Sequence, residues 1–259
     1  MFRIAAFSTS ALALSISAAA AATGVGLTDD RTLVMFDTET LEVTGTMDVE
    51  GVDRLLGIDL RPSNNTLVGV TDDMRIVTID TATGAATDLS TIDTPLEVGD
   101  MPVIVDFNPM ADRLRFMTGT TNHRVNVDTG EVTVDGSLNW VAEDENSEAS
   151  PMIAAAAYIN SYGTPEATAM YNIDSGLGAL LQQTAPNDGT LATIGMLNVE
   201  NPGEMMAFDV QTDAEGANMA WLVTNNTIHS VDLETGAATA AGEIAADGQI
   251  RDLAVLPAM

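Results

Sequence analysis

Short apolar runs that alternate with polar residues recur along the whole chain, and tight acidic turns separate many of them. Five such turns are recognisable by an aspartate that follows an apolar run, namely Asp37, Asp80, Asp128, Asp174 and Asp232. Each predicts a strand, a turn and a second strand. The copies recur about every 40 to 60 residues, which is the period of a propeller or array.

The clearest repeat contains four strands in succession. They are expected at Leu55 to Leu60, Thr66 to Val70, Arg75 to Ile79 and Ala86 to Leu89. Four short strands joined by turns form an antiparallel meander of the size of one propeller blade. Three similar quartets follow, and their first strands are expected at Val103 to Phe107, Ile153 to Ile159 and Met205 to Val210.

The two ends of the chain predict one further blade. Three strands are expected near the N-terminus, at Gly24 to Leu27, Thr32 to Phe36 and Glu42 to Met47, and one spare strand at Ile250 to Leu256. If the C-terminal strand lies innermost beside the other three, the ring closes without an open edge. We therefore predict an all-β, single-domain propeller of five four-stranded antiparallel blades.

Two alternatives remain for the middle of the chain. A divergent sixth blade could lie around residues 136 to 165. The alanine-rich segment Ile153 to Ala157 could also form a helix instead of a strand, because alanine favours helix over sheet.

The first residues have the pattern of a secretory signal. Arg3 precedes an apolar run of small residues, and Ala20-Ala21-Ala22 fits a cleavage site. We expect a signal peptide at residues 1–22, a propeller domain at 23–259, and export to the periplasm or the cell exterior. No later segment is apolar for long enough to span a membrane. The chain has no cysteine, so disulfides cannot stabilise it.

The charge of the chain narrows the range of partners. Its formal net charge is −29 at pH 7, with 38 acidic residues and no lysine. Such a field repels nucleic acid and anionic membrane surfaces. It is typical of a salt-adapted protein, whose self-repulsion is screened at high ionic strength, and it would also suit a surface that collects cations.

The polar residues of the first strands offer candidate chemistry. First strands line the axis of a propeller, so Asp59, Asp106 and Asp209 could converge there, with Tyr158 in the corresponding place of another blade. Like charges a few ångström apart raise one another's pKa. We therefore expect a metal ion such as Ca²⁺, a salt bridge to Arg61 or Arg113, or an acid/base pair. The structural alternative is that each aspartate accepts backbone hydrogen bonds from its own turn.

The remaining polar features are more readily explained by structure. The five turn aspartates are expected to cap their turns. His123 and His229 are expected on blade surfaces or between blades, since two histidines without cysteine make a zinc site improbable. The segment Asn122 to Asn126 is rich in hydrogen-bonding groups, so it is a candidate recognition patch as well as an ordinary solvated strand face.

Several longer motifs carry a family resemblance. They are Gly57-Ile58-Asp59-Leu60-Arg61-Pro62, the run Asp106 to Arg115, Asn122-His123-Arg124-Val125-Asn126, the run Ala155 to Ser161, and Pro186-Asn187-Asp188-Gly189. The chain resembles the secreted bacterial family known as domain of unknown function 4394. The resemblance implies an exported, propeller-like domain with no assigned activity, and it makes Arg61, Arg113, Arg115 and Arg124 candidate counter-charges for the strand-end aspartates.

Two classes of function follow from these observations. The first is a non-enzymatic module of the cell envelope that binds a small molecule, an ion or an envelope protein. Its candidate ligand-binding residues are Asp59, Arg61, Asp106, Asn108, Arg113, Arg124, Tyr158 and Asp209. The second is a glycosidase-like hydrolase that uses Asp59, Asp106 and Asp209 as acid, base and orienting groups. The sequence favours the first class, because the second requires catalytic geometry that no motif specifies.

Overall fold

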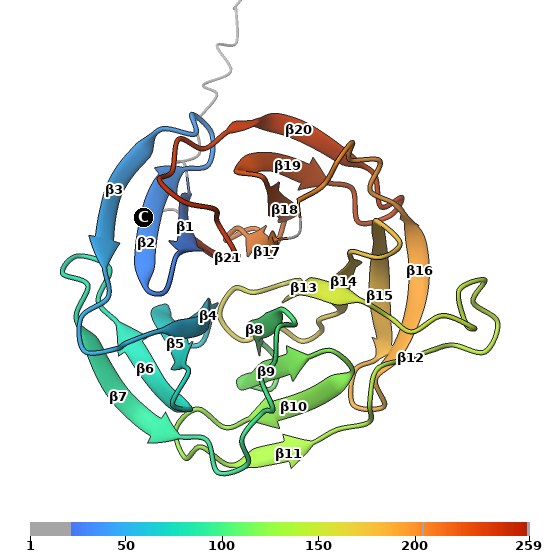
Figure 1. Cartoon of the computed structure of the whole chain (residues 1–259), viewed down its shortest axis with the longest axis horizontal. Helices are drawn as coiled ribbons and strands as arrows, with labels where there is room; N and C mark the ends of the chain where they lie inside the picture. Colours follow the sequence, from blue (N-terminus) through green and yellow to red (C-terminus); the bar gives the residue numbers. More distant parts are fainter. Residues whose placement is uncertain (1–21, 204, 258–259) are drawn as a thin grey trace, which may run out of the picture.

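The fold is a ring of five antiparallel β-sheets around a central axis (Figure 1). The computed structural model describes residues 22–203 and 205–257. The predicted secretory signal therefore lies outside the described residues except for Ala22. Among the described residues there is no helix, and hence none long and apolar enough to cross a membrane.

Each blade contains four strands ordered from the axis outward. They are blade 1 (β21 Asp252–Leu256, β1 Thr23–Thr28, β2 Thr32–Asp37, β3 Val43–Asp48), blade 2 (β4 Leu55–Arg61, β5 Thr66–Thr71, β6 Arg75–Ile79, β7 Ala86–Thr91), blade 3 (β8 Val103–Asn108, β9 Arg113–Thr118, β10 Thr121–Val125, β11 Val132–Val134), blade 4 (β13 Ile153–Tyr158, β14 Met170–Asp174, β15 Ala179–Ala185, β16 Thr190–Met196) and blade 5 (β17 Met206–Thr212, β18 Asn218–Thr224, β19 Thr227–Val231, β20 Ala238–Glu243). The prediction of a five-bladed propeller is confirmed.

Blade 1 is assembled from both ends of the chain. β21 pairs antiparallel with β1, with Gly26 opposite Leu253 and Gly24 opposite Val255. The C-terminal strand is innermost in its sheet, as predicted. This pairing closes the ring, so every blade has a neighbour on both sides.

Blade 4 settles both alternatives left open for the middle of the chain. Ile153–Tyr158 forms β13, so the helix considered for its alanine run was wrong. Both faces of β13 are buried between neighbouring blades, where small side chains fit and helix propensity is overridden. No sixth blade forms, because residues 136–152 contribute only β12 (Asn139–Trp140), which pairs parallel with the outermost strand β16.

The hydrophobic core is divided among the five interfaces between neighbouring blades. One cluster of buried residues fills each interface; the cluster between blades 5 and 1, for example, joins Phe36 of β2 to Trp221 of β18. The innermost strands are buried on both faces, while the outermost strands are largely exposed. The polar side chains of the innermost strands are therefore held in a rigid, desolvated ring.

Candidate functional site: the axial carboxylates

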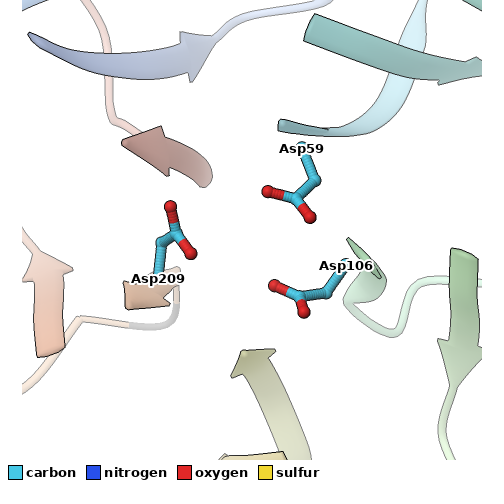
Figure 2. Close-up of side chains that lie close together, drawn as sticks. All are labelled: Asp59, Asp106 and Asp209. Carbon is cyan, nitrogen blue, oxygen red and sulfur yellow. The ribbon is translucent and has the colours of Figure 1, made fainter. Parts of the chain in front are cut away.

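Three buried aspartates converge on the axis of the propeller. Asp59 lies on β4, Asp106 on β8 and Asp209 on β17, and one carboxylate oxygen from each lies within 4.8 Å of the other two (Figure 2). Each residue is at least nine-tenths buried. Convergence arises because alternate residues of an innermost strand face the axis. The sequence-based prediction that these three residues meet is confirmed.

Each carboxylate also joins its own blade to the next one. Asp59 Oδ2 accepts a hydrogen bond from the Phe107 amide at 2.6 Å, and Asp106 Oδ1 accepts one from the Tyr158 amide at 3.0 Å. Asp209 Oδ2 accepts one from the Val255 amide at 2.6 Å. The aspartates thus accept backbone hydrogen bonds, but from a neighbouring blade rather than only from their own strand ends.

A fourth carboxylate, from Asp252 on β21, continues this chain of contacts. Its Oδ2 accepts a 2.7 Å hydrogen bond from the Ile58 amide of blade 2. Sequence reasoning missed this residue because it is out of register with the other three. Asp59 accepts the amide of Phe107, the residue after Asp106, and Asp209 accepts the amide of Val255, the residue after Ala254. Ala254 therefore occupies in β21 the place that Asp106 has in β8. Asp252 lies two residues earlier on the same face.

Blade 4 has no carboxylate at the axis. The Tyr158 amide donates to Asp106, just as the Phe107 amide donates to Asp59. Ala157, the residue before Tyr158, therefore occupies in β13 the position that Asp106 has in β8. The prediction that Tyr158 occupies the corresponding axial place was wrong by one residue. Its side chain packs instead between blades 3 and 4, where its hydroxyl accepts a 3.2 Å hydrogen bond from Arg115.

Burial controls the protonation of the axial carboxyl groups. Desolvation raises the pKa of Asp59 and Asp106 well above the ordinary value, and the negative charges of neighbouring axial aspartates raise both further. Desolvation raises the pKa of Asp209 to about 6 and that of Asp252 to about 7, although hydrogen bonds from backbone amides lower both. Burial thus shifts all four groups toward the neutral acid form, and a bound cation would shift them back toward the ionised form.

The arginines do not neutralise the axial aspartates. Arg61 forms bidentate contacts with Asp112 and Asp128, with shortest distances of 2.6 and 2.8 Å. No ion pair formed within residues 22–203 and 205–257 includes an axial aspartate. The expected salt bridge from Arg61 or Arg113 was therefore wrong. Arg61 extends past its strand end to acidic residues on blade 3.

Asp128 differs from the other turn aspartates because it binds Arg61 instead of capping its own turn. Asp37, Asp80, Asp174 and Asp232 accept turn amides as predicted. In the blade 3 turn this role belongs to Asn126, whose Oδ1 accepts the amide of Asp128. Asp128 is exposed and binds Arg61.

The polar segment Asn122 to Asn126 is largely internal. Asn122 and His123 are buried, and Arg124 binds Asp135 through both carboxylate oxygens. Asp135 also accepts a 2.7 Å hydrogen bond from buried Arg115. The polar groups of the predicted recognition patch are therefore used largely in internal contacts, among them this Arg115–Asp135–Arg124 cluster.

Three other predicted residues have local roles in the structure. Asn108 caps its turn by accepting the amides of Met110 and Ala111. Arg113 donates to the backbone oxygen of Asp112. His229 is buried on β19 and contacts the Thr227 carbonyl.

Comparison with known proteins identifies the family. The model of the family described as "Domain of unknown function (DUF4394)" matches residues 32–254. The chain belongs to this family. The resemblance noted in the sequence is thereby confirmed, and membership in DUF4394 assigns no activity. No curated protein matches this sequence.

Solved structures with the same kind of fold are distant in sequence. A Bacteroides thetaiotaomicron protein of unknown function is similar with a TM-score of 0.52 and 15% identity, and the match covers 91% of this chain and 61% of that one. A Bacteroides caccae protein of unknown function gives a TM-score of 0.45 and 9% identity, with 91% and 99% covered. The chain thus spans less than two thirds of the first of these proteins, and that likeness concerns the fold alone.

Proposed function

We propose that this DUF4394 protein is a non-catalytic binding module whose axial carboxylates bind a Ca²⁺ ion. The observation that carries the proposal is the convergence of Asp59, Asp106 and Asp209, with oxygens within 4.8 Å of one another in a buried ring. Calcium binds oxygen ligands at about 2.3–2.6 Å, so two ligands on opposite sides of the ion lie about 4.8 Å apart. The observed spacing meets this limit.

The hydrogen bonding of Asp106 supports a ligand at this point. Its Oδ1 accepts the Tyr158 amide, while its Oδ2 accepts no hydrogen bond from any residue among 22–203 and 205–257. Asp106 as a whole is 4% exposed, and a carboxylate in such desolvated surroundings is stabilised either by a proton or by a cation. Because no arginine in the described part of the chain forms an ion pair with these three aspartates, a metal ion is the counter-charge that fits the donor set.

The space at the site favours an ion over a sugar. A cavity of about 10 Å³ borders Asp59 and Asp209, which is about the size of one water-sized sphere. The carboxylate spacing resembles that of a retaining glycosidase, where the two groups lie about 5 to 5.5 Å apart. A glycosidase must hold a sugar between its carboxyl groups, and the volume beside these two is far smaller than a sugar ring. This comparison supports binding rather than hydrolysis.

We also propose that the module acts outside the cytoplasm. The support is the pattern of the first 22 residues, with Arg3, a run of small apolar residues and an alanine cleavage motif. The chain has no cysteine, so in an exported protein the five sheets and their interfaces would have to hold the fold without disulfides.

Thermal unfolding with and without calcium tests the axial site. Chelator-treated protein should melt at a higher temperature when Ca²⁺ is added, since a ligand at 100 times its Kd stabilises the folded state by about 2.7 kcal/mol. Asp106→Asn should abolish this shift while retaining the Tyr158 hydrogen bond through its side-chain oxygen. The matched control is Asp232→Asn, which removes one exposed turn carboxylate and should keep the full shift.

The control matters because the protein is so acidic. Calcium that merely screens the surface would stabilise both variants equally, and that result would refute the axial site. A calorimetric titration in buffers of different ionisation enthalpy should also detect proton release, because the carboxyl groups must ionise to bind the metal. Glycan hydrolysis that is lost in Asp106→Asn would instead support the hydrolase.

A further inference from the structure

A second, larger pocket lies between blades 5 and 1, which are neighbours in the ring (Figure 1). Its volume is about 620 Å³, within the range of sites that hold small organic ligands. The pocket shares Thr212 and Pro257 with the small axial cavity, so it opens near the end of the axis at which the innermost strands end.

The apolar wall of this pocket is aromatic and sulfur-containing. It is formed by Trp221 of β18, Met219 of the same strand and Tyr162 of the loop after β13. Tyr162 and Met219 are each about half exposed, at 48% and 51%, whereas Trp221 is 7% exposed and anchored by a 3.4 Å hydrogen bond from its indole nitrogen to Gln211. The pocket is therefore lined by a largely buried indole and by two accessible side chains.

All charged residues that line the pocket are acidic. They are Glu39, Asp213 and Glu215. Asp213 is occupied by hydrogen bonds from the amides of Glu215 and Ala217. Glu39 and Glu215 are exposed, and neither enters an ion pair within the described part of the chain. The pocket thus offers two unneutralised carboxylates beside an aromatic wall.

The positions of these two glutamates are set by similar turns. In each turn an aspartate accepts the amide of the glutamate two residues later, from Glu39 to Asp37 and from Glu215 to Asp213. One turn belongs to blade 1 and the other to blade 5. The negative charges therefore lie on two neighbouring blades, in turns held by hydrogen bonds to their own aspartates.

We infer that this pocket binds a small organic cation, an amine or quaternary ammonium group with an apolar body. Aromatic faces attract such cations through their quadrupole, and the effect is strongest for tryptophan. The two glutamates provide charge complementarity, and no arginine or histidine among the described residues lines the pocket, which disfavours an anionic ligand. This site is distinct from the axial carboxylates, and its ligand class does not depend on a metal ion.

Fluorescence of a single tryptophan gives a direct test. Trp140→Phe leaves Trp221 as the only indole, since the chain contains two tryptophans. Titration with choline at constant ionic strength should then change the emission of Trp221 in a saturable manner. The neutral isostere of choline, with carbon in place of the quaternary nitrogen, should bind on the order of tenfold or more weakly.

Charge variants separate the pocket from the acidic surface as a whole. The double variant Glu39→Gln and Glu215→Gln should weaken choline binding on the order of tenfold. The control pair Glu97→Gln and Glu131→Gln makes the same change in net charge at exposed positions that do not line the pocket, and it should leave binding unchanged. Equal loss in both pairs, equal binding of the isostere, or no saturable change in emission would overturn the inference.

Discussion

The carboxylate of Asp209 on blade 5 accepts a 2.6 Å hydrogen bond from the amide of Val255 on blade 1. Val255 belongs to the C-terminal strand, which also pairs with β1 through the sheet ladder. One residue is thus held from two directions, by its own sheet and by the neighbouring blade. Closure of the ring depends on both contacts, because one holds β21 in blade 1 and the other joins it to blade 5.

A chain that ends after Gln249 should fail to form the closed ring. The deletion removes β21, and with it the buried residues Leu253, Ala254 and Val255 and the partner of Asp209. Three buried apolar side chains and an orphaned buried carboxylate together exceed the usual margin of stability of a domain. Circular dichroism and size-exclusion chromatography should show an expanded or aggregated protein.

A circular permutant provides the complementary test of closure. Moving residues 248–257 ahead of Thr23, with a short linker, would make blade 1 continuous, because Leu256 and Thr23 are paired neighbours. This permutant should fold and melt within a few degrees of the parent. A truncated chain that melts like the full chain would contradict the role assigned to β21.

In the absence of metal ions, stability should fall as the pH rises from about 4 to 7. The folded pKa values of Asp209 and Asp252, about 6 and about 7, exceed the unfolded value of about 3.9. The folded state therefore retains protons that the unfolded chain releases, and each deprotonation above the unfolded pKa costs stability. For Asp209 alone the loss is on the order of 3 kcal/mol. Urea unfolding in chelator across this pH range measures it.

Two comparisons assign that pH dependence to the axis. Asp209→Asn should reduce the slope, because this side chain can no longer ionise while Asp252 still does, whereas the exposed Asp232→Asn should leave the slope between pH 4 and 7 unchanged. Saturating Ca²⁺ should also flatten the profile by favouring the ionised form. A slope that has the same magnitude in Asp209→Asn and with saturating calcium as in the metal-free parent would have to originate in the acidic surface.

The repeated turns show how far sequence spacing could determine the fold. In the turns that begin at Asp80 and Asp232, a glycine with positive φ follows four residues later, at Gly84 and Gly236. In blade 3 the residue four before Gly130 is Asn126. Counting back from the glycine would have identified Asn126 as the capping residue. The strand order was predictable because turns and alternating strands are local signals.

The partners of the axial residues were less accessible from sequence. Alternation predicted that Asp59, Asp106 and Asp209 face the axis. It could not predict that Asp252 joins them or that Tyr158 lies one residue past the axial position, because both depend on the register between blades. The pairing of Arg61 with Asp112 and Asp128 joins residues 51 and 67 positions apart. Such contacts are fixed by three-dimensional packing between blades, for which the sequence has no periodic signal.

The buried Arg115–Asp135–Arg124 cluster should contribute far more stability than an exposed ion pair. Asp135→Asn would leave Arg115, which is 1% exposed, without its carboxylate partner, and breaking a buried pair costs about 3–5 kcal/mol. Asp88→Asn breaks the exposed contact with Arg75 and should cost less than about 1 kcal/mol. Chemical unfolding of both variants measures the difference. Equal losses would mean that water, together with the remaining hydrogen bonds from Arg115 to Asn122 and Tyr158, compensates fully within the cluster.

Two glycines in similar turns separate backbone strain from crowding. Gly130 and Gly178 both have positive φ, at 78° and 64°. A Cβ at Gly178 would meet nothing within 4 Å, whereas a Cβ at Gly130 would overlap the carbonyl oxygen of Thr91 on β7 of the neighbouring blade. Left-handed backbone costs an L-residue about 1–2 kcal/mol, and Leu41 adopts φ 62° in the blade 1 turn, so the strain alone is tolerated.

Gly178→Ala should therefore destabilise the protein by about 1 kcal/mol, and Gly130→Ala by at least about 2 kcal/mol more, because it must move two blades apart. Thermal and urea unfolding of the two variants, measured side by side, tests this difference. If both variants lose the same stability, the contact between the blade 3 turn and β7 yields without cost, and the interface between blades 2 and 3 is looser than its packing indicates.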